Sequence, residues 1–155
     1  MTTQNQNNST PDLTQRPPRS PRIRLGGYVL LPRMLDKGRA EIAGKNGEYH
    51  YNCPLDQHFV KFVGIDSAGL REQLAAGKGD GEILNWINET AEHKRTPWEI
   101  EQWSEYMQRR GPESDAETRA HFGDMLGKIS QSREDITTWA ALLDLDDYVS
   151  FGGQP

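Results

Sequence analysis

The sequence predicts a mostly α-helical fold: a compact single domain of six or seven short helices with at most one small β element. After residue 30, apolar residues recur at the three- and four-residue spacings of amphipathic helices. Proline, capping residues and glycine divide this pattern into short segments. The alternation typical of a strand occurs over Gly47–Asn52, where we expect a short extended piece. The expected organisation is a disordered leader over residues 1–18, one helical domain over residues 19–148 and a flexible tail over residues 149–155.

The N-terminal segment has the composition of a solvated leader. Its first twenty residues are mainly Gln, Asn, Thr, Pro and Arg, and they offer too little apolar surface to offset the entropy lost on ordering. Three prolines within Arg16–Arg22 favour an extended path. A second interpretation stays open, in which Arg19–Arg24 packs along the body as an ordered arm.

The first helix is expected to have Pro32 in its first turn and to end before Gly44. One face carries the apolar spacing of a buried stripe: Leu31, Met34, Leu35, Gly38 and Ile42. The opposite face carries Arg33, Lys37 and Glu41. The simplest interpretation of these charges is a solvated face.

Local signals mark the remaining helices. Residues suited to a helix start are Pro54, Asp66, Asp80, Thr96 and Ser114. Thr96 and Ser114 each open a capping box, completed by Glu99 and Glu117. Glycines suited to a helix end follow at Gly64, Gly77 and Gly111. A last helix is predicted from Ile136, Trp139, Ala140 and Leu143.

Charge and composition exclude several classes of partner. The net charge is −5, yet residues 1–40 hold seven Lys and Arg against two Asp, which leaves the rest of the chain at −10. A body this acidic repels a polyanion, so we expect no duplex nucleic acid partner. The longest apolar run, Tyr28–Pro32, is far shorter than the roughly 20 residues that cross a bilayer, so we expect no membrane partner. A single cysteine and the lack of a secretory signal fit the cytoplasm.

Cys53 is the most reactive group in the sequence. It precedes Pro54 at the start of a predicted helix, where the positive end of the helix dipole favours a thiolate. His50 and His58 flank it, and Asp56 lies in the first turn, so a thiol, an imidazole and a carboxylate are close in sequence. This pattern predicts catalytic roles for Cys53 and Asp56. The alternative is that Cys53 is a half-buried packing residue.

A second candidate site is cationic. Arg33, Lys37 and Arg39 on the first helix, together with the basic arm, predict an anion-accepting site, and Glu48 is included among its ligand-binding residues. The expected partner is a small anionic ligand or an acidic protein. A structural ion-pair network linking Arg33, Asp36, Arg39 and Glu48 is the alternative. The histidines lack metal-ligand spacing and no phosphate-binding glycine loop is present, so the sequence predicts no metal and no cofactor.

A resemblance to a bacterial family classed only as a domain of unknown function is carried by four blocks: Pro18–Pro21, Leu25–Tyr28 (LGGY), Leu31–Ala40 (LPRMLDKGRA) and Gly47–Gln57 (GEYHYNCPLDQ). It covers Pro18–Leu145 and implies a small bacterial cytosolic protein, with no particular reaction. The shared motifs include Arg33, Asp36, Lys37, Arg39, Glu48, Cys53 and Asp56.

Taken with the residues, these patterns favour a binding or interaction module whose anion-accepting site is formed by the N-terminal arm and the first helix. The alternative is a thiol-dependent enzyme with Cys53 as its nucleophile.

Overall fold

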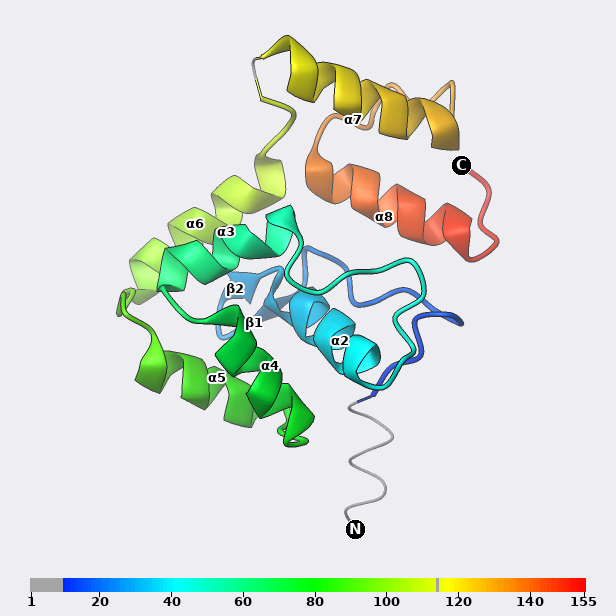
Figure 1. The fold of residues 1–155 in the computed structure, drawn as a ribbon. Helices are drawn as coiled ribbons and strands as arrows, with labels where there is room; N and C mark the ends of the chain where they lie inside the picture. Colours follow the sequence, from blue (N-terminus) through cyan, green and yellow to red (C-terminus); the bar gives the residue numbers. More distant parts are fainter. Residues whose placement is uncertain (1–9, 114) are drawn as a thin grey trace.

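The computed structural model describes residues 10–113 and 115–155, and in this part of the chain it contains seven helices and one two-stranded sheet (Figure 1). The strands are β1 (Arg24–Leu25) and β2 (Tyr28–Val29); the helices are α2 (Leu31–Ile42), α3 (Pro54–Val63), α4 (Ser67–Ala75), α5 (Asp80–Thr90), α6 (Pro97–Arg109), α7 (Ala116–Ile129) and α8 (Trp139–Ser150). The predicted mostly α-helical single domain is confirmed.

Helix α2 lies at the centre of the fold, and every residue from Leu31 to Ala40 is buried. Its apolar stripe packs into a core shared with the hairpin and with α3, α4 and α5, built from Tyr28, Leu31, Met34, Leu35, Phe59, Val63, Leu70, Leu74, Ile83 and Ile87. The expected solvated face is wrong: Arg33 and Lys37 are as buried as the apolar residues. Each cation meets a carboxylate from a distant segment, Asp147 or Asp56, which allows the charge to be buried.

The small β element is a hairpin in which Arg24 pairs with Val29 and Leu25 with Tyr28. Gly26 and Gly27 join the strands, both with positive φ, which is the backbone conformation of the tightest hairpin turns. No strand forms over Gly47–Asn52, where a short extended piece was expected. That segment contains two turns, with positive φ at its two ends, and alternation of polar and aromatic residues does not form a strand without a pairing partner.

Most helix starts follow the local signals. The capping box of α6 forms, with Thr96 accepting from the N–H of Glu99 and Glu99 from that of Thr96. Two starts differ from the prediction. Asp80 is the first residue of α5 rather than its cap, and the cap of α7 is Asp115, which accepts from the N–H of Thr118. The expected cap, Ser114, lies outside the described residues.

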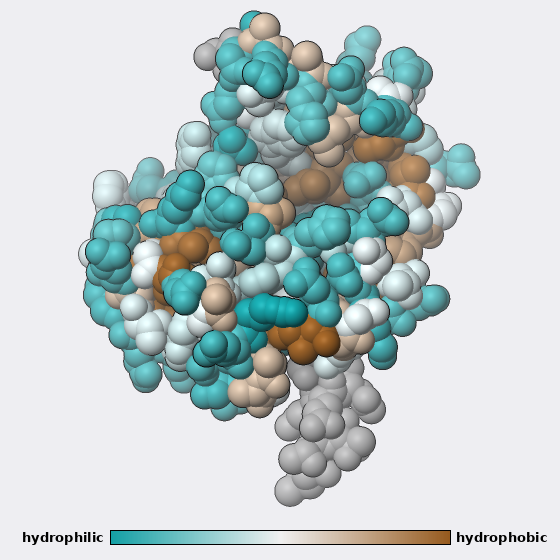
Figure 2. Space-filling model, viewed as in Figure 1, coloured by the Kyte–Doolittle hydropathy of each residue, from teal (hydrophilic) through white to brown (hydrophobic). Residues whose placement is uncertain are grey.

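Helices α7 and α8 form a separate pair beside the main body (Figure 1). They share a second hydrophobic cluster of Phe122, Ile136, Leu142 and Leu145. The face in Figure 2 is largely hydrophilic, and hydrophobic side chains show through over this helix pair. Helix α8 also packs on α6, and its residues Leu143, Asp146 and Ser150 line a cavity together with α2 and the loop before α3.

The N-terminal arm, defined here as residues 10–23, runs along α2. Leu13, which falls within the expected leader, is 1% exposed, and its N–H donates to the carbonyl of Lys45 at 2.8 Å. Further along, the backbone N–H of Arg19 donates to Asp36 on α2. Residues 1–9 of the expected leader lie outside the described residues. Within the part that the structure describes, none of the helices has the length and apolar character required to cross a membrane.

Candidate functional site

Two cavities lie on either side of α2, and together they contain most of the charged residues singled out in the sequence. The arm pocket, of about 670 Å³, lies between the N-terminal arm, α2 and the start of α5; its polar residues include Arg16, Arg19, Asp36, Arg39, Asp80 and Glu82. The thiol pocket, of about 700 Å³, lies between α2, the loop before α3 and the C-terminal helices; its polar residues include Arg33, Lys37, Tyr49, His50, Cys53 and Asp146.

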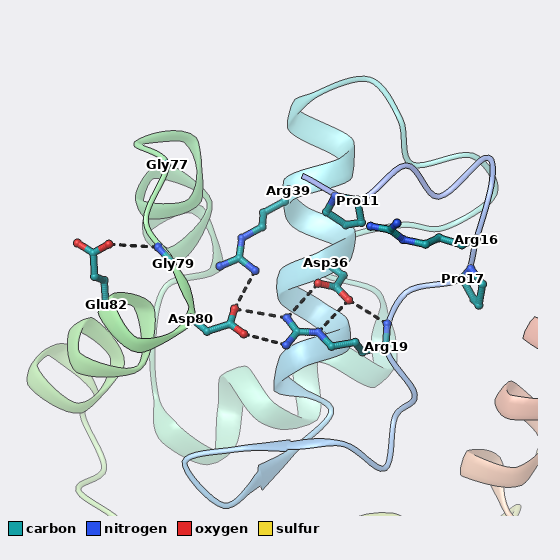
Figure 3. Close-up of a pocket in the computed structure, with 10 residues that line it drawn as sticks. All are labelled: Pro11, Arg16, Pro17, Arg19, Asp36, Arg39, Gly77, Gly79, Asp80 and Glu82. Atoms are coloured by element: carbon teal, nitrogen blue, oxygen red, sulfur yellow. Dashed lines mark hydrogen bonds and ion pairs between the residues drawn. The ribbon is translucent and has the colours of Figure 1, made fainter. Parts of the chain in front are cut away.

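In the arm pocket, Arg19 connects the arm to two helices (Figure 3). Its Nη2 donates to Asp36 Oδ1 at 3.0 Å, and its Nη1 donates to Asp80 Oδ2 at 2.8 Å. Arg39 donates from Nη1 to the other oxygen of Asp80, at 2.8 Å, and from Nη2 to the carbonyl of Lys78, at 3.1 Å. Asp80 is therefore shared by two guanidinium groups, one from the arm and one from α2.

This arrangement shifts the pKa values of the groups involved. Burial alone would raise the pKa of Asp80, but the hydrogen bonds from Arg19 and Arg39 outweigh it and lower that pKa below its usual value. Burial opposes the charge on Arg19, while Asp80 and Asp36 raise the pKa of its guanidinium. Both groups stay charged across the physiological range.

The same cavity holds cationic donors that no carboxylate uses. Arg16 lines it, is exposed, and has no ion-pair partner within 4.0 Å among residues 10–113 and 115–155. The side chain of Arg39 is 7% exposed, and its Nε has no hydrogen-bond acceptor in the described part of the chain.

In the thiol pocket, Lys37 contacts both groups that the sequence predicts to be catalytic. Its Nζ lies 2.9 Å from Asp56 Oδ2 and donates to Cys53 Sγ at 3.3 Å. The side chains of Lys37 and Asp56 are 5% and 2% exposed, whereas Cys53 is half-buried and faces the cavity. Cys53 is the N-cap residue of α3, as its position before Pro54 predicts.

The other cation of this pocket is also paired. Arg33 donates to both oxygens of Asp147 on α8, at 2.7 and 3.2 Å, and the hydroxyl of Tyr49 donates to Asp147 at 2.8 Å. Burial first and Asp147 second raise the pKa of the Tyr49 hydroxyl, which therefore stays protonated and able to donate. Both cations of the thiol pocket are thus neutralised within the protein.

The structure brings together four of the six predicted site residues, since Arg33, Lys37, Glu48 and Cys53 line the thiol pocket. Asp56 lies behind Lys37, and Arg39 faces the arm pocket on the other side of α2. His50 lines the thiol pocket, but His58 does not.

The ion-pair network suggested by the sequence alternative has different partners. Asp36 pairs with Arg19, while Arg33 and Arg39 pair with Asp147 and Asp80. Sequence reasoning missed Asp80 and Asp147 as partners because they lie 41 and 114 residues away from the arginines that they bind. No local signal marks such a pair. In residues 10–113 and 115–155, no three His, Cys, Asp or Glu side chains gather as metal ligands.

Comparison with known proteins places the chain in a family without giving it an activity. No curated protein matches it. A family described as a domain of unknown function, DUF5069, matches residues 15–149, a span that includes the later part of the arm, most residues of both pockets and all but the end of α8. The chain belongs to this family of domains of unknown function.

Proposed function

We propose that this protein is a binding module that accepts a small anionic ligand in the arm pocket. The observation that carries the proposal is a cavity lined by three arginine side chains, Arg16, Arg19 and Arg39, of which Arg16 has no ion-pair partner among the described residues, while Asp36 and Asp80 pair with the other two and Glu82 also lines it. Guanidinium groups present planar pairs of N–H donors that suit carboxylate and phosphate oxygens.

The arm pocket supports anion binding better than the thiol pocket does. In the thiol pocket, Arg33 and Lys37 each form an ion pair with a buried carboxylate, and Asp146 adds a further negative group. In the arm pocket Arg16 has no such partner and lies at the surface, where a ligand can reach it. A concave cavity of this volume suits a small molecule rather than the surface of an acidic protein.

The proposal is tested by thermal unfolding of the full chain at low ionic strength with increasing inorganic sulfate. Binding to the folded state raises the stability by about 2.7 kcal/mol at a ligand concentration of 100 times Kd. The variant Arg16→Gln removes the unpaired cation without breaking an internal pair, so it should weaken sulfate binding about tenfold, as expected for one lost hydrogen bond to a charged group.

The matched control is Arg119→Gln, because Arg119 is an exposed arginine on α7 and its removal changes the net charge by the same amount. It should bind sulfate like the wild type. Equal losses in the two variants, or no sulfate-dependent stabilisation of the wild type, contradict the proposal.

A second candidate function is thiol chemistry at Cys53, and the contact between Lys37 Nζ and Cys53 Sγ favours it. The ammonium group lies 3.3 Å from the sulfur, and the sulfur is at the N-terminal end of α3. Asp56 then acts as a positioning residue, because it holds the Lys37 ammonium beside the sulfur.

Iodoacetamide labelling at neutral pH tests this candidate, with the same chain in denaturant as the reference for an unperturbed cysteine. Native Cys53 should react faster than denatured Cys53. The double variant Lys37→Met/Asp56→Leu, which removes both members of the buried pair together, should lose this advantage. Slower labelling of the native chain, or an unchanged rate in the double variant, removes the candidate.

A further inference from the structure

We infer that the thiol pocket carries out acyl transfer, in which Cys53 attacks the carbonyl carbon of a neutral ester and takes its apolar acyl group as a thioester. This inference rests on the second candidate function, thiol chemistry at Cys53, and names the reaction and the substrate class for that site. Four features of the pocket support it.

The first feature is a lysine that connects the sulfur to a carboxylate. Lys37 Nζ donates to Cys53 Sγ at 3.3 Å and to Asp56 Oδ1 at 3.0 Å. Asp56 also accepts from the backbone N–H of Asn52 at 3.0 Å, so two donors fix its orientation. Lys37 and Asp56 are buried, whereas Cys53 lines the cavity. A nucleophile, a proton carrier in contact with it and a third group that orients the carrier are the parts of an activated nucleophile.

The second feature is the open start of α3, a helix of 10 residues. Cys53 is its N-cap residue, and no side chain caps the helix. Pro54 has no N–H, and the N–H groups of Leu55 and Asp56 have no acceptor among residues 10–113 and 115–155. Leu55 lines the same cavity as Cys53. N–H groups at a helix start can stabilise a carbonyl oxygen that becomes negatively charged during nucleophilic attack.

The third feature is the apolar part of the lining. The cavity of about 700 Å³ has room for a substrate larger than an acetyl ester. Helices α7 and α8 contribute Met125 and Leu143 to it. An acyl group bound in the cavity would bury its carbons against such side chains. The apolar lining residues are Leu13, Leu55, Met125, Leu143 and Phe151.

The fourth feature is the charge of the lining. Its two cations, Arg33 and Lys37, are ion-paired with buried carboxylates. Glu48 and Asp146 also line the cavity, and neither carboxylate has an ion-pair partner within 4.0 Å in the described part of the chain. Both groups repel an acidic substrate, so a neutral ester is the better match.

The reaction needs only the protein, the ester and water. Cys53 Sγ bonds to the carbonyl carbon, and the bond from that carbon to the alcohol oxygen breaks. Lys37 gives a proton to the leaving oxygen and takes up the thiol proton, so a free alcohol and a thioester result. Water then cleaves the thioester: its hydroxyl group joins the acyl carbon, its remaining proton returns to the sulfur through Lys37, and the carboxylic acid is released.

The test compares p-nitrophenyl acetate and p-nitrophenyl hexanoate as substrates of the full chain at neutral pH. Release of p-nitrophenolate gives the acylation rate constant, and mass spectrometry locates the acyl group. Hexanoate should acylate Cys53 at least about tenfold faster than acetate, because each additional buried methylene group raises the rate about fourfold. Cys53→Ala should release p-nitrophenolate only at the background rate of surface groups. Lys37→Met/Asp56→Leu should be acylated at least about tenfold more slowly than the wild type.

Two further variants test whether the cavity holds the acyl group. Met125 and Leu126 are neighbours on α7, both are half-buried, and both pack against the same hydrophobic cluster. Of the two, Met125 lines the cavity and Leu126 does not. Met125→Ala should therefore lower the ratio of the hexanoate rate to the acetate rate by at least about threefold, whereas Leu126→Ala should keep the ratio of the wild type.

The outcomes separate this inference from the function on which it rests. If iodoacetamide labels native Cys53 faster than denatured Cys53 but hexanoate forms no adduct on it, thiol chemistry stands and acyl transfer is wrong. If the two esters acylate Cys53 at equal rates, or if Met125→Ala and Leu126→Ala change the ratio equally, the cavity does not hold the acyl group and the inference is overturned. If neither reagent reacts faster with the native chain than with the denatured chain, both fail.

Discussion

Arg33 on α2 and Asp147 on α8 form a buried ion pair through two hydrogen bonds, of 2.7 and 3.2 Å, across 114 residues of sequence. Their side chains are 5% and 8% exposed. The hydroxyl of Tyr49 donates to the same carboxylate, and the guanidinium lies over the Tyr49 ring. This pair fixes the C-terminal helices to the central helix and forms one wall of the thiol pocket.

Removing one member of this pair should be strongly destabilising. Arg33→Met leaves the Asp147 carboxylate buried without its cation, and the expected loss of unfolding free energy is about 3–5 kcal/mol, measured by urea denaturation. The double variant Arg33→Met/Asp147→Leu should recover most of it, because no uncompensated charge remains. The exposed pair Arg133–Asp135 provides the control, and Arg133→Gln should leave stability nearly unchanged. A double variant no more stable than Arg33→Met would contradict this explanation.

Ser104 should be required for the attachment of the hairpin to α6. It is fully buried, donates to the carbonyl of Gly27 at 2.8 Å and accepts from the N–H of Val29 at 3.3 Å. Ser104→Ala leaves both backbone groups without their partner and should cost about 1–3 kcal/mol in thermal or urea unfolding. Ser132→Ala, at an exposed position after α7, is the matched control and should have little effect. Equal stability of the two variants would argue against this attachment.

Two glycine-to-alanine substitutions should change the stability of the fold in opposite directions. A β-carbon at Gly111 would lie 2.8 Å from the backbone carbonyl oxygen of Thr137, and a backbone atom cannot move aside cheaply. Gly111→Ala should therefore destabilise the junction of α6 and α8 by about 1–3 kcal/mol. Gly123 lies inside α7 with nothing within 4 Å, so Gly123→Ala should stabilise by up to about 1 kcal/mol through helix propensity. If Gly111→Ala and Gly123→Ala both raise or both lower the melting temperature, this explanation is wrong.

His58 should make stability fall as the solution is acidified. Its burial, followed by the nearby charges of Arg110 and Lys61, lowers the pKa of the imidazole below its usual 6.5. The folded state therefore favours neutral His58, and this contribution to stability is complete above pH 6.5 and is lost as the pH falls through the folded pKa. His58→Gln should reduce the loss of unfolding free energy between pH 7.5 and pH 5.5. An identical pH profile in wild type and variant would show that His58 does not contribute.

The sequence by itself determined the helical segments, because their signals are local. Pro54 at the first position of α3, Gly64 in the left-handed conformation at its end, and the box between Thr96 and Glu99 act within one or two turns. Local rules gave a wrong result at Gly47–Asn52, because a strand exists only where a partner pairs with it.

The candidate sites depended on tertiary structure. The sequence indicated that Arg33, Lys37 and Cys53 lie near one another, but not that the two cations are buried against Asp147 and Asp56. It also did not indicate that Arg39 faces the opposite cavity. Helical periodicity distinguishes an apolar face from a charged face, whereas the burial of a charge depends on whether a distant segment supplies its counterion. Only the folding of the arm, α3, α5 and α8 around α2 decided that.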